Sequence, residues 1–107
     1  MATTYLSPQQ LKDFAQRVEQ VAKKFPAEVV RIRHSFSRDW DGDPAIYFRI
    51  VLTDKTRRDQ RLSELTGLIG NALVKDLALY EEYSDYIPYF YYRAKSEQDK
   101  LQDPEWE

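Results

Sequence analysis

Apolar side chains recur every three or four residues in the first part of the chain, which is the period of an α-helix. The repeating positions are Leu11, Phe14, Ala15, Val18, Val21, Ala22 and Phe25. Ser7 precedes this run, with Pro8 directly after it and Gln10 three positions on, the residue types of a capping box that starts a helix. Because Pro26 cannot continue helical hydrogen bonding, the pattern predicts a helix that begins at Pro8 and ends before Pro26.

Two later segments alternate apolar and polar side chains, which is the period of a β-strand with one buried face. They span Val29–Ser37 and Ala45–Thr53. The apolar face of these segments carries Val30, Ile32, His34, Phe36, Ile46, Phe48, Ile50 and Leu52. The polar stretch between them predicts a hairpin loop, so even-numbered side chains are expected to face the core and odd-numbered ones the opposite side.

A second helical period follows a charged connection at Thr53–Ser63. Its apolar positions are Leu62, Leu65, Ile69, Leu73 and Leu77. Within it, Gly67 and Gly70 are small residues one turn apart, which favours close approach of a neighbouring element. A third strand is expected at Ile87–Arg93, and Pro88 makes it an edge strand because proline cannot donate to a central ladder.

The predicted order of elements is α-β-β-α-β, and each element has one apolar side. The economical packing is an α+β two-layer sandwich with two helices on one face of a three-stranded sheet. Residues 1–94 are expected to form this single domain. Residues 95–107 are a polar, acidic C-terminal tail, for which we expect a short helix followed by a disordered end.

Composition narrows the possible function classes. Sixteen basic and eighteen acidic residues give a net charge of −2, which argues against a protein that coats nucleic acid through excess cations. The absence of cysteine excludes disulfides, thiolate chemistry and cysteine zinc sites. The sequence has neither a signal-peptide pattern nor an apolar run of roughly 20 residues. We therefore expect a cytoplasmic protein without a membrane partner, and no cofactor, because no glycine-rich phosphate loop or metal-ligand spacing is present.

The stretch Arg38–Pro44, RDWDGDP, carries the only dense acidic cluster near a predicted turn. Its loop candidates are Asp39, Trp40, Asp41 and Asp43. A calcium loop that began at Asp39 needs glycine at its sixth position and glutamate at its twelfth, where the chain has Pro44 and Ile50. A two-metal site needs a further carboxylate, which Asp54 is able to supply. We favour a hairpin turn with a left-handed glycine, in which Trp40 covers one end of the core.

His34 is the only histidine, and its position places it on the apolar face. The favoured interpretation is a packed residue, since one histidine does not make a zinc site without other ligands. A general-base role is the alternative if Asp39 or Asp41 folds back toward it.

The odd-numbered face of the sheet interleaves arginine with tyrosine. The candidate binding residues are Arg31, Arg33, Tyr47, Arg49, Tyr89, Tyr91 and Arg93. Arginine pairs with phosphate and tyrosine stacks on bases, as in single-strand nucleic-acid platforms. The same residue types are also enriched in protein-interface hot spots.

Three function classes follow. The favoured one is a small non-enzymatic binding module for a protein partner, including homodimerisation through the open sheet face or edge. The first alternative is single-stranded RNA or DNA binding through the Arg/Tyr face. The second is a metal-dependent enzyme that uses the Asp39/Asp41/Asp43 loop.

Overall fold

The computed structural model describes residues 6–107, so residues 1–5 of the expected domain lie outside it. One mixed sheet has the order β1-β2-β3, with β1 antiparallel and β3 parallel to β2. Its strands are β1 (Val29–Arg38), β2 (Pro44–Leu52) and β3 (Ile87–Ala94). The helices are α1 (Pro8–Lys23), α2 (Asp54–Arg57), α3 (Leu62–Asp76), α4 (Leu79–Glu82), α5 (Lys95–Leu101) and the short 3₁₀ helix η1 (Pro104–Trp106).

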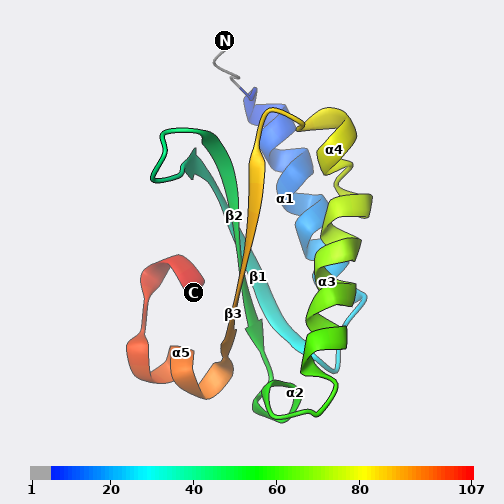
Figure 1. Cartoon of the computed structure of the whole chain (residues 1–107), viewed down its shortest axis with the longest axis vertical. Helices are drawn as coiled ribbons and strands as arrows, with labels where there is room; N and C mark the ends of the chain where they lie inside the picture. Colours follow the sequence, from blue (N-terminus) through cyan, green and yellow to red (C-terminus); the bar gives the residue numbers. More distant parts are fainter. Residues whose placement is uncertain (1–5) are drawn as a thin grey trace.

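The helices α1, α3 and α4 lie on one side of the sheet, whereas α5 and η1 lie on the other (Figure 1). The predicted α+β two-layer sandwich is therefore confirmed. We call the sheet side toward α1 and α3 the inner face and the opposite side the outer face. The expected edge position of the third strand is also confirmed, because within residues 6–107 β3 pairs with β2 alone. Among residues 6–107, no helix is both long and apolar enough to cross a membrane.

The first helix begins where its capping residues predicted. The Ser7 hydroxyl accepts a hydrogen bond from the Gln10 amide at 3.1 Å, and the Ser7 amide donates to the Gln10 side chain at 2.7 Å. These two bonds satisfy amides that a helix start leaves without an intrahelical partner. They fix the direction in which α1 presents Phe14, Val18 and Val21, all buried, to the sheet.

The core lies between the inner face and the helices. Its fully buried side chains from the sheet and from α3 are Ile32, Ile46, Phe48, Ile50, Leu52, Ile69 and Leu73. β3 packs on α3 beside Gly70, where a Cβ would lie at an ordinary contact distance of 3.6 Å from the Tyr92 hydroxyl. That hydroxyl donates to the Thr66 carbonyl at 2.9 Å, and burial raises the pKa of Tyr92 to about 12. The packing therefore requires a glycine at neither position, since Gly70 has room for a Cβ and Gly67 faces open space.

The inward and outward alternation of β1 breaks near its start. The pairing register with β2 shifts between Val29 and Arg31, which is the effect of one extra residue in a strand. Val29 therefore lies in the core, and Val30 is 37% exposed. The expectation that Val30 faces the core is wrong for this reason, although Ile32 keeps the predicted side.

The C-terminal segment returns to the sheet instead of leaving it. The chain passes from β3 directly into α5, and η1 then contacts β1 and β2 on the outer face (Figure 1). Trp106 is only 7% exposed and Gln98 is fully buried. The predicted short helix is present, but the expectation of a disordered end is wrong.

Candidate functional site: the outer face of the sheet

The loop between β1 and β2 is a tight turn organised by one carboxylate. Asp39 accepts hydrogen bonds from the amides of Asp41 at 3.0 Å and Asp43 at 2.9 Å, and from the Tyr89 hydroxyl at 2.8 Å. The Gly42 amide donates to the Asp39 carbonyl at 2.9 Å, and Gly42 has a φ of 84°. This left-handed glycine closes a type I turn in the way three-residue hairpin loops require, as the sequence predicted.

These contacts also set the protonation states of the pair. Burial alone raises the pKa of Asp39, but the hydrogen bonds from Asp43, Tyr89 and Asp41 outweigh it and hold the pKa below its ordinary value. The bond to Asp39 is the main cause that raises the pKa of Tyr89 to about 12. Asp39 therefore remains an anion that ties the hairpin to β3.

The acidic side chains of the loop lie far from Asp54, the further carboxylate that a two-metal site would need. Asp39, Asp41 and Asp43 place carboxylate oxygens within 4.8 Å of one another, but both oxygens of Asp39 already accept hydrogen bonds within the protein. Asp54 lies beyond the opposite end of β2, where it accepts from the Ser96 amide at 3.0 Å. Nine strand residues separate the loop from Asp54, a span of roughly 30 Å.

His34 and the aspartates lie on different sides of the sheet. The imidazole packs on the inner face, with ring-centroid distances of 5.0 Å to Phe14 and 5.9 Å to Phe36. Asp39 instead binds Tyr89 of the outer face. The general-base arrangement is therefore not formed, and His34 is the packed residue that the sequence favoured.

We expect the stability of the protein to fall as the pH drops below about 6.5. Burial, reinforced by the charge of Arg33, lowers the pKa of His34 from 6.5. The unfolded chain then binds a proton more readily than the folded one, so the stabilisation present above pH 6.5 is lost as the pH falls through the lower folded pKa. Urea unfolding at pH 7.5 and 5.5 measures this loss. His34→Gln, which cannot titrate, should remove most of the difference, and an unchanged difference in that variant would contradict the assignment.

Three arginines project from the outer face where η1 lies over it. We call Arg31, Arg49 and Arg93 the arginine row. Arg31 donates to the Trp106 carbonyl at 3.1 Å, and Arg49 lies 3.4 Å from the Glu105 carboxylate. Val51 of β2, which lies between Arg31 and Arg93 in the strand register, is fully buried although it points to the outer face.

Arg93 makes the most extensive contacts of the row. Its guanidinium lies 4.0 Å from the centre of the Trp106 ring, a cation–π arrangement. It donates to the Gln98 side chain at 2.7 Å and lies 3.7 Å from the Asp103 carboxylate. Gln98 in turn donates to the Asp103 carbonyl at 2.8 Å and to the Glu107 carboxylate. The row thus binds a peptide segment of the same chain through its backbone, its carboxylates and its ring.

Arg33 does not join the arginine row. Its guanidinium lies 3.7 Å from Glu19 of α1, at the outer edge of β1. The sequence placed Arg33 with the other outward arginines, but its long side chain reaches the adjacent helix instead.

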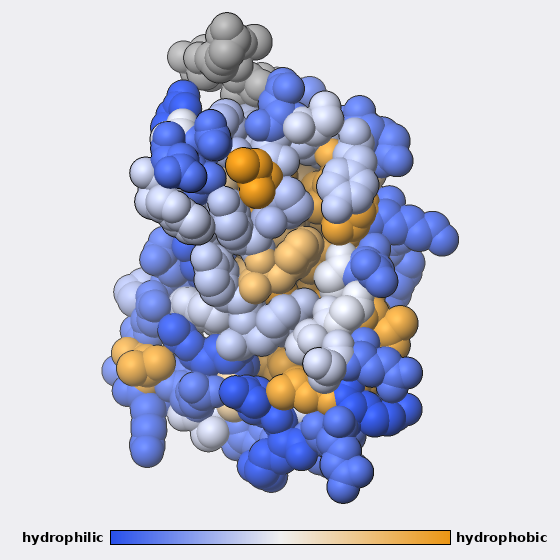
Figure 2. Space-filling model, viewed as in Figure 1, coloured by the Kyte–Doolittle hydropathy of each residue, from blue (hydrophilic) through white to orange (hydrophobic). Residues whose placement is uncertain are grey.

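The rest of the outer face, beside the hairpin, is aromatic. We call Trp40, Tyr47, Tyr89 and Tyr91 the aromatic strip. The Tyr47 ring stacks on Tyr89 at 5.3 Å and on Tyr91 at 6.1 Å, both at 17°, and Trp40 contacts Tyr89 at 5.7 Å. Trp40 is 77% exposed, so the expectation that it covers the core is wrong. Figure 2 shows strongly apolar side chains only in small separate areas of the face in view, with residues of intermediate hydropathy gathered over the hairpin and β3.

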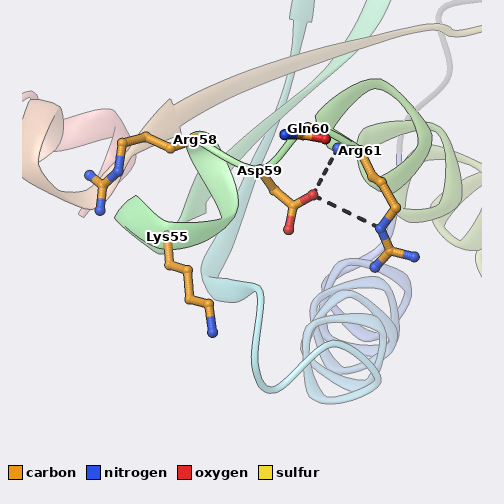
Figure 3. Close-up of a pocket in the computed structure, with 5 residues that line it drawn as sticks. All are labelled: Lys55, Arg58, Asp59, Gln60 and Arg61. Carbon is orange, nitrogen blue, oxygen red and sulfur yellow. Dashed lines mark hydrogen bonds and ion pairs between the residues drawn. The ribbon is translucent and has the colours of Figure 1, made fainter.

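A cationic corner lies at the other end of the sheet, between α2 and α3. Lys55, Arg58, Asp59, Gln60 and Arg61 line an open hollow there. Figure 3 shows the three cationic side chains pointing in different directions, and Arg61 lies 3.9 Å from Asp59. Groups that diverge in this way do not converge on one anion, so the outer face of the sheet is the better candidate site.

Comparison with known proteins assigns no relationship: no protein-family model matches the chain, and no curated protein matches it. The arguments for function therefore depend on the chain's own geometry.

Sequence reasoning missed the residues that bind the arginine row, namely Gln98, Asp103, Glu105 and Trp106. A signal for them was present, because a tryptophan within a polar, acidic tail is rarely left in solvent. The tail is acidic and the outward side chains are arginines, so their opposite charges also indicate that the tail binds there.

Proposed function

We propose that the chain is a non-enzymatic protein-interaction module that associates with a second copy of itself through the aromatic strip. The observation that carries the proposal is a continuous ladder of exposed and half-buried rings on the part of the outer face beside the hairpin. Trp40 is 77% and Tyr91 43% exposed. Tryptophan and tyrosine dominate the residues that contribute most to protein interfaces, because they bury a large area at a small entropic cost.

A protein fits this surface better than a nucleic acid. The Arg49 and Arg93 side chains are only 14% and 19% exposed, and each lies within 4 Å of a carboxylate. Their charges are therefore not free for phosphates, on which most nucleic-acid affinity depends. The hairpin adds the exposed carboxylates of Asp41 and Asp43 next to the strip, which repel a phosphate backbone further.

The sheet face is also favoured over the sheet edges. On the β3 edge, Pro88 removes a backbone donor, and on the β1 edge the register shift at Val30 interrupts regular pairing. Prolines and bulges are the devices by which proteins block the addition of a strand. Association through the flat aromatic strip needs no backbone pairing.

A second copy of the chain is the proposed partner, because the aromatic strip can form both halves of a two-fold interface. Such an interface needs only one self-complementary patch. The strip is made of neutral rings, and the hairpin beside it carries both Arg38 and Asp41, so two copies bring opposite charges within reach. Four rings supply only part of the roughly 800 Å² per partner of a standard interface, so we expect a dissociation constant on the order of 10 μM.

Sedimentation equilibrium tests this proposal. The mass of the wild-type protein should rise from 12.7 kDa toward twice that value as its concentration increases. A range from about 1 to about 200 μM brackets the expected dissociation constant. The Trp40→Ala/Tyr91→Ala double variant should remain monomeric. Tyr80→Ala is the matched control, because Tyr80 is a 68% exposed tyrosine on α4, away from the outer face.

Two results would overturn the proposal. One is a wild-type protein that stays monomeric over the whole concentration range. The other is binding of a single-stranded oligonucleotide that disappears in the double variant, which would assign the strip to nucleic acid instead.

A further inference from the structure

The segment Asp103–Glu107, of sequence DPEWE, occupies the arginine row as a peptide ligand would. It presents the Trp106 backbone carbonyl to Arg31 at 3.1 Å, the Glu105 carboxylate to Arg49 at 3.4 Å and the Trp106 ring to Arg93 at 4.0 Å. Each guanidinium of the row therefore meets a different group of one short segment. Together these contacts bind an acidic segment of the chain that carries an aromatic side chain.

We propose that the arginine row is a binding site for an acidic segment of a partner protein that carries an aromatic residue, and that residues 103–107 are its exchangeable occupant within the chain. The proposal does not rest on self-association through the aromatic strip. It assigns a second, chemically different site to the other half of the outer face.

The contacts define what a partner segment must offer. Guanidinium groups form strong charge-assisted bonds with carboxylates and also stack on aromatic faces, whereas lysine does only the first well. The segment must also keep Val51 covered, which is fully buried where η1 contacts β2. A carboxylate one residue before the ring, as Glu105 stands before Trp106, must reach Arg49. An acidic segment without an aromatic residue satisfies only part of this set.

The residues of the occupant are bound unequally, and the helix before it is fixed. Ala94 passes directly into α5, whose Gln98 is fully buried, so α5 is fixed. Within the occupant, Trp106 is 7% exposed and Glu107 accepts a hydrogen bond from Gln98. Glu105 in contrast has a side chain that is 67% exposed, and exposed ion pairs add little stability. A partner segment that displaces residues 103–107 must therefore replace the contacts of Trp106, while α5 stays in place.

A tethered occupant lowers the apparent affinity for any other peptide. Tethering through a short connection gives an effective concentration in the millimolar range, and a free peptide binds only the fraction of molecules whose site is open. Weakening the occupant therefore raises the affinity for a free peptide of the same chemistry.

Fluorescence anisotropy with a labelled peptide of residues 102–107, acetylated and amidated to remove terminal charges, measures this effect on the full chain. We expect the peptide to bind Trp106→Ala at least about tenfold more tightly than the wild type. A peptide with alanine in place of its tryptophan should lose at least about tenfold in affinity for the same variant. Far-UV circular dichroism checks that the variant is folded.

Two protein variants localise the binding. Arg49→Gln, added to Trp106→Ala, should weaken the binding of the peptide. Arg33→Gln, added in the same way, should leave the affinity unchanged, because Arg33 pairs with Glu19 instead. Should Trp106→Ala fail to fold, Glu105→Ala, which changes an exposed side chain, takes its place with an expected gain of about threefold.

Equal affinities of the wild type and of the folded variant would overturn the proposal. So would a loss of peptide binding when Trp40→Ala/Tyr91→Ala is added, since the peptide would then bind the aromatic strip. Failure of self-association leaves the expected peptide result unchanged, so the two proposals fail separately.

Discussion

Replacing Trp106 with alanine should lower the free energy of unfolding by about 3 to 5 kcal/mol. The ring is 7% exposed, lies 4.0 Å from the Arg93 guanidinium and belongs to the segment that covers the lower half of the outer face. Its loss exposes Val51 and leaves a cavity that the short η1 helix cannot close. Urea unfolding followed by far-UV circular dichroism measures the change.

The chain supplies its own control, because it contains a second tryptophan in the opposite environment. Trp40 is 77% exposed at the tip of the hairpin, so Trp40→Ala should change the free energy of unfolding by no more than about 0.5 kcal/mol. Similar losses in the two variants would mean that Trp106 is not packed against the sheet in solution. The comparison also separates folding from association, since Trp40 belongs to the aromatic strip and Trp106 does not.

The sequence predicts those elements whose local signals agree with their packing. In α1, the Ser7 cap, Pro8 and the apolar stripe all point to one helix, and the helix begins where they predict. Along β2, the alternation from Ile46 to Leu52 corresponds to side chains that the core actually buries. Agreement between several independent local signals is what makes such predictions hold.

The sequence does not predict features that depend on contacts between distant segments. The register shift that turns Val30 outward follows from how β1 pairs with β2, which no local alternation encodes. The outward direction expected for Arg31, Arg49 and Arg93 agrees with the geometry, but what covers them is decided by the C-terminal segment. That segment lies 75 residues from Arg31 along the chain, and its polar, acidic composition did not indicate whether it docks on the sheet.

The outer face is therefore divided between two chemistries. Arg49 connects them, since its guanidinium lies 3.4 Å from Glu105 and 5.6 Å from the centre of the Tyr47 ring. Displacement of the terminal residues frees Arg49 on the side of the row while the Tyr47 ring keeps it in place on the side of the strip. A partner segment on the row and a second copy on the strip would thus meet at this one side chain.

Replacing Phe14 with alanine should destabilise the protein by about 3 to 5 kcal/mol, through the inner face rather than the outer one. Phe14 is 1% exposed, and its ring centre lies 4.9 Å from Phe36, 5.0 Å from His34 and 5.1 Å from Tyr83. One ring thus joins α1 to β1 and to the residue that follows α4, so its removal opens a cavity between three elements.

Leu11→Ala is the matched control, because Leu11 lies one turn earlier on α1 and is 41% exposed. Its loss should cost less than about 1 kcal/mol, as measured by the same urea unfolding. If Phe14→Ala cost no more than Leu11→Ala, the aromatic cluster would not be the junction that holds α1 on the sheet. Phe14→Ala should lower the free energy of unfolding strongly, while its folded fraction still binds the peptide as before. That result would show that the inner face supplies stability and the outer face recognition, independently of each other.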